Sequence, residues 1–370
     1  MNSIKVISFI IKNIINIFKC KFEYQIPKKN DILLFDRGRK EFLHNLNFKY
    51  NILDIRLESI NIPTLKKTYQ ETKFNNFSKN YIKNYISFVK PRVIITFSDY
   101  NPTFFILKEI AHPYKLVTIA IQSSLRNKNS FKVFSKNRHF RYKCDYYLFI
   151  QKFQKEKLLK KNIKAKFINI GSFRNNSLKI RKREKSELVL YISQFQEWVY
   201  QKRNEEYKKE IKILKWLSQI CKENGLHLKI AIKSNIPGHN NLDYNSNRKL
   251  YLRYFNFLNI ENIVSAKGKI NNYHHVDEAR IIIFESSTLG LEALSRGKKV
   301  LAYPTQKFSV KKNDFFWSTK YSKKKFNDVF LKILKMKNSK WQYLSKKSQL
   351  RFIRDESNLI FVGLMNKILD

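Results

Sequence analysis

Residues 279–300, ARIIIFESSTLGLEALSRGKKV, contain an apolar run that leads directly into hydroxyl residues and then into a helical pattern. The run ARIIIF predicts a buried strand, and the helix is expected to begin near Leu289. Short continuous apolar runs are typical of parallel strands that are covered on both faces. Ligands of open α/β sheets bind beyond the carboxyl ends of the strands, so the turn after this strand is a candidate binding site.

Ser286, Ser287 and Thr288 form that turn, and Glu292 follows on the first turns of the helix. Hydroxyl groups and free backbone N–H groups at a helix N-terminus favour a phosphate group. Glu292 could accept hydrogen bonds from a ribose. Alternatively, Ser287 and Thr288 only cap the helix, and the turn taken by itself leaves both interpretations open.

Similar alternation of apolar runs and helical patterns extends over most of the chain and is typical of a doubly wound α/β protein. A first group of strands is predicted at 31–35, 50–55, 92–97, 116–121 and 146–150, and a second at 188–192, 228–232, 263–265, 279–284 and 299–303. Helices are predicted at 68–89, 202–224 and throughout 326–369. The basic stretch 171–187, GSFRNNSLKIRKREKSE, lacks hydrophobic periodicity and is interpreted as a linker.

The chain has 370 residues, more than one hydrophobic core usually serves, and two domains are therefore expected. We predict two Rossmann-like doubly wound domains that face a central cleft. The predicted divisions are an amphipathic N-terminal helix at 1–30, an N-terminal domain at 31–180, a C-terminal domain at 181–345 and a C-terminal helix at 346–370.

The N-terminal helix combines isoleucines at three-to-four spacing with interspersed Lys and Asn. Its apolar stretches are too short for a spanning helix, and no cleavage site of a signal peptide follows. The helix either lies in a membrane interface or packs on its own domain. The expected location is cytoplasmic, and attachment to the inner face of the plasma membrane stays open.

Lys and Arg number 74 against 29 Asp and Glu, which gives a net charge of +45. Three causes stay open: AT-rich codons, which favour Lys, Asn and Ile together; attraction to an anionic membrane surface; and nucleic-acid binding, for which no zinc-finger, KH, RRM or helix-turn-helix signature is found. Cys20, Cys144 and Cys221 are far apart and suggest reduced thiols. His274 and His275 lack a partner at helical spacing, so no metal site is predicted.

In the N-terminal domain, Asp36 and Asp99 directly follow predicted strands. A carboxylate that faces the cleft there could act as a general base on an attacking hydroxyl. Alternatively, Asp99 caps the helix that follows it. Arg37 either meets a phosphate of the acceptor or pairs with Asp36.

Five further residues are candidate ligands of a nucleotide diphosphate. Gln122 and Arg126 follow the predicted strand at 116–121, and Gly171 and Ser172 close the N-terminal domain. A guanidinium group matches phosphate oxygens in a bidentate fashion, which favours Arg126. Lys233 lies beyond a strand of the C-terminal domain and could face a phosphate.

Eight segments occur in order along most of the chain: DILLFDR (31–37), KPRVIITFSDYN (90–101), IAIQSSLR (119–126), CDYYLFI (144–150), IGSFRNN (170–176), YISQFQEW (191–198), FESSTLGLEALSRGKKVLAY (284–303) and FFWS (315–318). Together they resemble a bacterial family of surface carbohydrate, or surface polysaccharide, biosynthesis proteins with a GT-B glycosyltransferase-like architecture. Segment 284–303 is similar to the donor-nucleotide segment of GT-B glycosyltransferases and sugar epimerases. Ser123 and Ser124 depart from the more usual Asn-Gly, and residues 233–240 lack the His-Pro pair of some CMP-sugar transferases.

The resemblance implies a metal-independent glycosyltransferase that uses a nucleotide-sugar co-substrate and no further cofactor. The C-terminal domain would hold the donor, and the N-terminal domain would hold a lipid-linked acceptor for a surface polysaccharide such as lipopolysaccharide or capsule. Closure about the linker would bring the two together. Two alternatives stay open: a CDP-polyol phosphotransferase of the teichoic-acid kind, and a non-catalytic basic scaffold that binds anionic membrane or nucleic acid.

Overall fold

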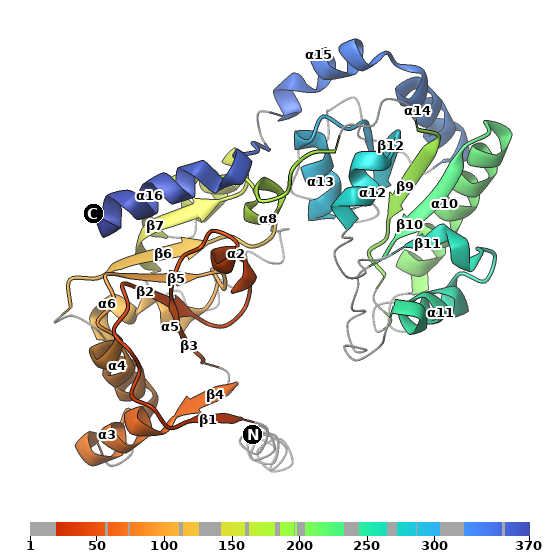
Figure 1. The fold of residues 1–370 in the computed structure, drawn as a ribbon. Helices are drawn as coiled ribbons and strands as arrows, with labels where there is room; N and C mark the ends of the chain where they lie inside the picture. The colour runs from red at the N-terminus through yellow and green to blue at the C-terminus, as the bar shows by residue number, and fades with distance from the viewer. Residues whose placement is uncertain are drawn as a thin grey trace. The chain divides into compact units, whose positions relative to one another are not determined.

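The structure is a computed structural model that describes residues 20–55, 58–72, 75–110, 114–125, 142–159, 163–181, 186–195, 197, 204–232, 244–264, 272–285, 287–303, 322–349 and 352–370. These residues form two compact units (Figure 1). Unit 1 draws on Met1–Ser124, Phe131–Ser177 and Asp355–Asp370, and unit 2 on Leu125–Ser130 and Leu178–Arg354. Apart from the short segment Leu125–Ser130, the chain changes unit at Leu178 and Asp355, where the sequence placed its divisions at residues 181 and 346.

Unit 1 is built on a six-stranded parallel sheet in the order β3-β2-β5-β6-β7-β8. Its strands are β2 (Ile32–Phe35), β3 (Asn51–Leu53), β5 (Val93–Thr96), β6 (Val117–Ile121), β7 (Lys143–Phe149) and β8 (Lys164–Asn169). Every residue of β2 and β5 is buried, as expected for parallel strands whose two faces are both covered.

A second, two-stranded parallel sheet in unit 1 pairs β1 (Lys21–Glu23) with β4 (Ser59–Asn61). Residues 20–30 were predicted to belong to an N-terminal helix, and this part of the prediction is wrong. The reason lies in the alternation KFEYQI, whose period of two is that of a strand. Residues 1–19, where the amphipathic helix was predicted, lie outside the described residues.

Helices cover both faces of the unit 1 sheet. Leu33 belongs to the same apolar cluster as Ile86 on one face, whereas Leu34 belongs with Phe361 on the other. The helices are α2 (Glu41–His44), α3 (Ile62–Thr72), α4 (Phe77–Val89), α5 (Pro102–Phe105), α6 (Leu107–Ile110), α7 (Lys152–Leu159), α8 (Phe173–Asn176) and α16 (Leu359–Leu369). Unit 1 is thus a doubly wound α/β unit.

The single helix predicted over 68–89 is two helices, α3 and α4. Asn76 precedes α4 in the left-handed conformation, with a φ of 48°. Asn is one of the few residues besides Gly that adopts this conformation readily, so the break carries no Gly or Pro signal. The two helices are joined in the interior by a hydrogen bond of 3.2 Å from the Asn84 amide to the Thr68 hydroxyl oxygen.

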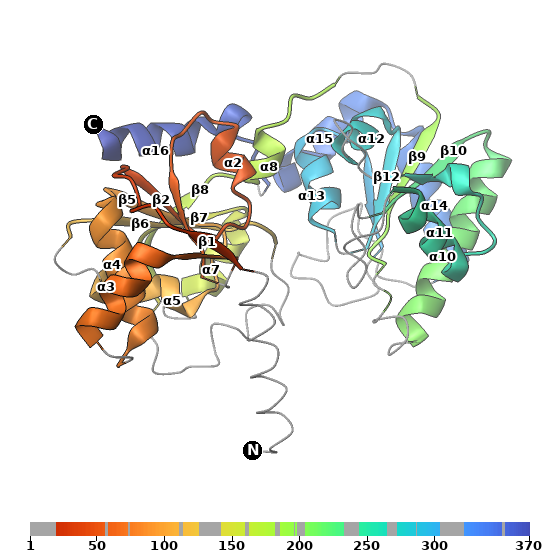
Figure 2. The same ribbon diagram turned by 60° about the horizontal axis from the view of Figure 1, so that its bottom comes forward.

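The C-terminal region is also interrupted, contrary to the prediction of continuous helix over 326–369. It contains α14 (Lys323–Lys335), α15 (Asn338–Gln349), a 3-10 turn η3 (Glu356–Asn358) and α16. Asn358, with a φ of 56°, donates through its amide to the Phe173 carbonyl at 3.0 Å. The amide ties the start of α16 to α8, and the helix covers one face of the sheet of unit 1 (Figures 1 and 2).

The stretch 171–187 is not all linker, because its first part belongs to unit 1. It contains α8, whose Asn175 and Asn176 are buried. Asn176 donates through its amide to Asn358 at 2.9 Å and to the Ile170 carbonyl at 2.7 Å. Asparagines are common in loops, which is why the sequence indicated a linker here. In the structure they are buried and connect α8 to neighbouring segments.

Unit 2 has a five-stranded parallel sheet in the order β11-β10-β9-β12-β13. The strands are β9 (Leu188–Ile192), β10 (His227–Ala231), β11 (Ile263–Val264), β12 (Ile281–Phe284) and β13 (Val300–Ala302). Besides α14 and α15, its helices are α10 (Asn204–Glu223), α11 (Tyr244–Tyr254), the 3-10 turn η2 (Ile260–Asn262), α12 (Asn272–Glu278) and α13 (Thr288–Ser295). In both views α10 and α14 lie on one side of this sheet, and α12 and α13 on the other (Figures 1 and 2).

Within the described part of the chain, none of the helices combines the length and the apolar character that crossing a membrane requires.

Candidate functional site

Topology marks one position in each sheet where a ligand is expected. The strand order reverses between β9 and β12 in unit 2, and between β2 and β5 in unit 1. Open α/β sheets bind ligands outside the carboxyl ends of strands at such reversal points. The residues that follow these four strands are therefore candidate ligands, and most of the predicted site residues are among them.

In unit 2 the segment after β12 forms a turn with an unusual helix start. Ser287 occupies the N-cap position of α13 in extended conformation, but its side chain makes no capping hydrogen bond. The alternative that Ser287 serves only as a cap is therefore not supported. The backbone N–H of Leu125 donates a hydrogen bond of 3.3 Å to the Thr288 hydroxyl oxygen and so orients the Thr288 side chain. Ser286 lies outside the described residues.

Gly290 allows α13 to lie directly against the end of β12. A Cβ atom added at Gly290 would be 2.1 Å from the Cγ atom of Phe284, which is far closer than real contacts permit. Phe284 is fully buried. Only glycine fits at this position, so the first turn of α13 is fixed by its contact with the strand.

Glu292, the predicted ribose ligand, is buried and already has a protein partner. The Tyr273 hydroxyl of α12 donates to Glu292 Oε2 at 2.5 Å. The Arg296 guanidinium lies over the Tyr273 ring, 5.4 Å from its centroid. The Glu292 carboxylate is thus held in one orientation near the turn. Only 7% of the residue is exposed.

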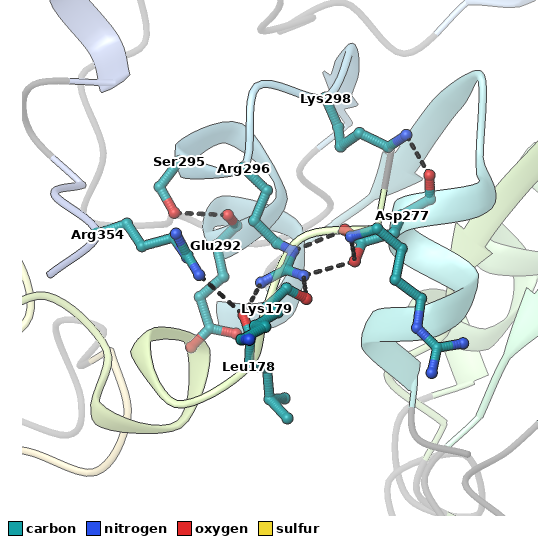
Figure 3. Close-up of polar contacts among 9 residues, drawn as sticks. Leu178, Lys179, Asp277, Glu292, Ser295, Arg296, Lys298 and Arg354 are labelled. Carbon is teal, nitrogen blue, oxygen red and sulfur yellow. Dashed lines mark hydrogen bonds and ion pairs between the residues drawn. The ribbon is translucent and has the colours of Figure 1, made fainter. Parts of the chain in front are cut away.

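Arg296 also forms a fully buried ion pair with Asp277 (Figure 3). Its guanidinium donates to the two Asp277 carboxylate oxygens at 2.8 and 2.6 Å, and to the carbonyls of Leu178 and Lys179 at 3.2 and 3.0 Å. Arg354 donates to the same Leu178 carbonyl at 2.9 Å. The last residue of the main segment of unit 2 is therefore hydrogen-bonded to the first.

Sequence reasoning missed this ion pair. Asp277 entered the argument only as a neighbour of His274 and His275, and Arg296 was one of 74 basic residues. Nineteen positions separate the two side chains, so no local spacing signals their contact.

A second buried polar group lies beside the carboxyl ends of β9 and β12. The Ser193 hydroxyl donates to Glu210 Oε1 of α10 at 2.7 Å, and the Tyr191 hydroxyl donates to Glu285 Oε1 at 3.5 Å. Burial, together with the nearby Glu285 charge, raises the pKa of Glu210 to about 8. Glu210 therefore holds its proton more tightly than an exposed glutamate does. Neither glutamate was predicted as a site residue.

In unit 1 the two predicted general bases are buried. Asp36 accepts a hydrogen bond from the Ser98 hydroxyl at 2.7 Å and is 2% exposed. Asp99 is completely buried and accepts a short hydrogen bond from the Tyr147 hydroxyl. Asp36 thus connects the residues that follow β2 and β5, and Asp99 connects the residues that follow β5 to β7. The role of the two carboxylates as general bases stays a prediction.

The other predicted ligands of unit 1 that the structure describes serve its local structure. Gln122 accepts from the Ile150 N–H at 3.1 Å and donates to the Ser124 carbonyl at 2.9 Å. Gly171 has a positive φ of 69°, and Ser172 caps α8 by accepting from the Asn175 N–H. Lys233 and Arg126 lie outside the described residues.

Arg37 pairs with Asp54 and not with Asp36, as one alternative had it. Its Nε and Nη2 atoms donate to the two Asp54 carboxylate oxygens at 3.1 and 2.6 Å. Asp54 also accepts from the Ser59 hydroxyl at 2.6 Å. Asp54 is on the wall of a cavity of about 360 Å³, whose other walls are mostly apolar and include Leu53, Leu65 and Tyr81.

Among the described residues, no group of three or more His, Cys, Asp or Glu side chains is arranged to hold a metal ion. The three cysteines are buried and free of disulfides.

Two Rossmann-like doubly wound units with parallel sheets and a helical C-terminal end define the GT-B fold class, as the sequence predicted. Two solved structures support this assignment. The UDP-GlcNAc 2-epimerase from Neisseria meningitidis has a TM-score of 0.54 and 12% identity, covering 91% of this chain and 99% of the other. The sucrose-phosphate synthase from Thermosynechococcus elongatus has a TM-score of 0.53 and 12% identity, covering 92% and 99%.

A third solved structure, that of the wall teichoic acid polymerase TagF, has a TM-score of 0.52 and 11% identity, covering 92% of this chain and 89% of the other. No curated protein sequence matches the chain. The chain belongs to the family described as "putative O-antigen biosynthesis protein", whose model matches residues 119–369. The predicted membership in a surface polysaccharide biosynthesis family is thereby confirmed.

Proposed function

We propose that the protein is a glycosyltransferase that moves a sugar from a nucleotide-sugar donor to an acceptor for a surface polysaccharide. The observation that carries the proposal is the uncapped start of α13 at the strand-order reversal of unit 2. The backbone N–H groups of the first turn and the Ser287 hydroxyl are not consumed by a side-chain cap. A diphosphate is the chemical group that such a turn stabilises best.

Three side chains complete the proposed donor site. Thr288 and Ser287 bind the diphosphate, and Glu292 accepts a hydrogen bond from a ribose hydroxyl. The hydrogen bond from the Tyr273 hydroxyl holds the Glu292 carboxylate in position for the ligand. The helix N-terminus stabilises the departing diphosphate, which is the charge that develops when the sugar–oxygen bond breaks. We therefore propose that transfer needs no metal.

The fold neighbours support a nucleotide donor in general terms. The Neisseria meningitidis epimerase was solved with UDP-GlcNAc bound, and the S. aureus MnaA structure, which has a TM-score of 0.52 and 11% identity, contains UDP. We propose that the acceptor is lipid-linked, that it occupies unit 1, where the cavity beside Asp54 offers apolar walls, and that the reaction takes place at the cytoplasmic face of a membrane.

A matched pair of serines tests the donor site. Ser322 is the N-cap of α14 and accepts from the Lys325 N–H at 3.3 Å, whereas Ser287 makes no such bond. In thermal unfolding with UDP-, GDP-, dTDP- and CMP-sugars, a bound donor at 100 times its dissociation constant should add about 2.7 kcal/mol. Ser287→Ala should weaken donor binding about tenfold with little change in stability. Ser322→Ala should cost about 1 kcal/mol of stability and leave donor binding intact.

Stabilisation by no nucleotide, or identical behaviour of the two variants, would overturn the proposal. A CDP-polyol phosphotransferase is the second candidate, favoured by the fold similarity to the teichoic acid polymerase. That candidate predicts stabilisation by CDP-glycerol or CDP-ribitol and none by nucleotide sugars. A non-catalytic basic scaffold would bind nucleic acid in a salt-dependent way that Ser287→Ala does not change.

A further inference from the structure

The segment from Lys21 to Lys29 shows an inverted pattern of burial. Phe22, Tyr24 and Ile26 are exposed, with 39%, 74% and 62% of their surfaces accessible. These three residues lie at and directly after β1, within five positions of one another. Large apolar side chains of a globular domain are more often buried in its core. Here three of them are exposed close together in the chain.

The backbone of this segment is held firmly, so the exposure is not that of a frayed end. β1 pairs with β4, and the Asn61 amide donates to the Gln25 carbonyl at 2.8 Å. The Asn51 amide donates to the Lys28 carbonyl at 2.7 Å. Asn61 is itself buried. Three large apolar side chains are thus displayed from a fixed support.

Basic residues flank these three apolar residues. Lys21, Lys28 and Lys29 precede and follow them in the chain, and Glu23 is the one acidic residue of the segment. Lys21, Lys28 and Arg37 also line an open groove of about 620 Å³, whose lining includes Phe22, Tyr24 and Ile26. Cations around exposed aromatic and aliphatic side chains match the interfacial zone of an anionic bilayer, where the rings lie at headgroup level.

We propose that the Lys21–Lys29 segment docks the protein on a membrane surface that contains anionic phospholipid. Phe22, Tyr24 and Ile26 enter the boundary between headgroups and acyl chains, while the three lysines pair with lipid phosphates. Ile26 distinguishes this surface from a nucleic-acid platform, because an aliphatic side chain offers no stacking face to a base. The inference rests on the proposed function in that a lipid-linked acceptor gives such docking its purpose.

The test uses the full chain and vesicles of phosphatidylcholine, either pure or with about one third phosphatidylglycerol, in a flotation assay. The wild-type protein should float with the anionic vesicles, and less so at high salt. The triple variant Phe22→Ser, Tyr24→Ser and Ile26→Ser should bind at least about tenfold more weakly. Lys28→Gln with Lys29→Gln should lose about tenfold or more.

A matched control replaces three apolar residues that are also exposed but scattered, Tyr69, Tyr343 and Leu359, with Ser. This control should float like the wild-type protein, and all variants should keep the wild-type unfolding temperature. Equal loss in the control and the triple variant would overturn the proposal. So would unchanged flotation of the triple variant, or a change from dimer to monomer in it, since the latter would assign the open edge of β1 to a second copy.

Donor stabilisation separates this inference from the proposed function. Vesicle binding without stabilisation by any nucleotide would contradict the proposed glycosyltransferase function and support the docking surface. Stabilisation by a nucleotide without vesicle binding would support the proposed function and contradict the docking surface. Single-stranded nucleic acid could also displace the vesicles from the wild-type protein. If the triple variant no longer bound that nucleic acid, the segment would be assigned to nucleic acid and the docking proposal would be overturned.

Discussion

At the scale of single residues, Glu210 shows how burial determines charge. Its carboxyl is enclosed between β9 and α10, accepts the Ser193 hydroxyl and lies close to Glu285. The pKa of Glu210 is raised from its ordinary value of 4.5 to about 8. The folded protein therefore retains a proton that the unfolded chain releases between these two values. Stability from this group is complete below pH 4.5 and is lost as the pH rises through 8.

Glu210→Gln should accordingly leave stability at pH 5 nearly unchanged and raise it by roughly 1–3 kcal/mol at pH 9, because the amide needs no proton to stay neutral. Urea unfolding at several pH values measures the effect. Glu223→Gln, an exposed position at the end of the same helix, serves as the control and should follow the wild-type profile. Parallel profiles for wild type and Glu210→Gln would contradict the assignment.

The sequence identified residues at both strand-order reversals but not their partners. Asp36 and Asp99 were found because carboxylates follow apolar runs, whereas their burial depends on Ser98 and Tyr147, which lie 62 and 48 positions away. Ser172 and Ser287 occupy equivalent helix starts, yet one caps its helix and the other does not. Such differences depend on tertiary packing, which spacing along the chain does not encode.

At the scale of elements, the contact between α13 and β12 depends on the missing side chain of Gly290. The methyl group of Gly290→Ala would overlap the Phe284 ring, so this variant should lose about 1–3 kcal/mol of folding stability. Gly363→Ala on α16 is the control, because a Cβ there has nothing within 4 Å and the change should stabilise by about 0.5–1 kcal/mol.

Chemical denaturation of both variants measures the contrast. Phe284→Leu combined with Gly290→Ala should recover part of the loss, since the two positions share one contact. If Gly290→Ala were as stable as Gly363→Ala, the close contact between α13 and Phe284 would not be what holds α13 in place.

Elements were predictable where both sheet faces are covered. β9 was predicted with its observed bounds, and β12 lies inside the predicted run, because continuous apolar stretches mark central parallel strands. β8 was missed because it is an edge strand with Lys at alternate positions and partial exposure throughout most of its length. The turn between α3 and α4 was missed because Asn76 takes the conformation that Gly usually signals.

At the scale of the whole molecule, Arg296 binds the start of unit 2 to its interior. Arg296→Met would leave Asp277 buried without its counter-charge and the Leu178 and Lys179 carbonyls without this donor, at a cost of about 3–5 kcal/mol. Arg280→Met removes an ion pair that is largely exposed, with Glu187, and should cost less than about 1 kcal/mol.

All four tryptophans lie within Leu178–Arg354, so their fluorescence follows the unfolding of unit 2 alone. Amide hydrogen exchange gives a second measurement, because the Arg181 N–H donates to Asp277 and should exchange faster in Arg296→Met. Equal losses in Arg296→Met and Arg280→Met would show that the buried pair is no more important than the surface one.

The return of α16 to unit 1 has a consequence for synthesis on the ribosome. The face of the first sheet that carries Ile95 and Leu34 is covered by Phe361 and Met365, residues translated only after all of unit 2. Translation adds 5–20 residues per second, so that face stays without α16 for on the order of ten seconds or more. During that interval the second unit can finish folding first, while the nascent first unit presents an apolar surface to chaperones.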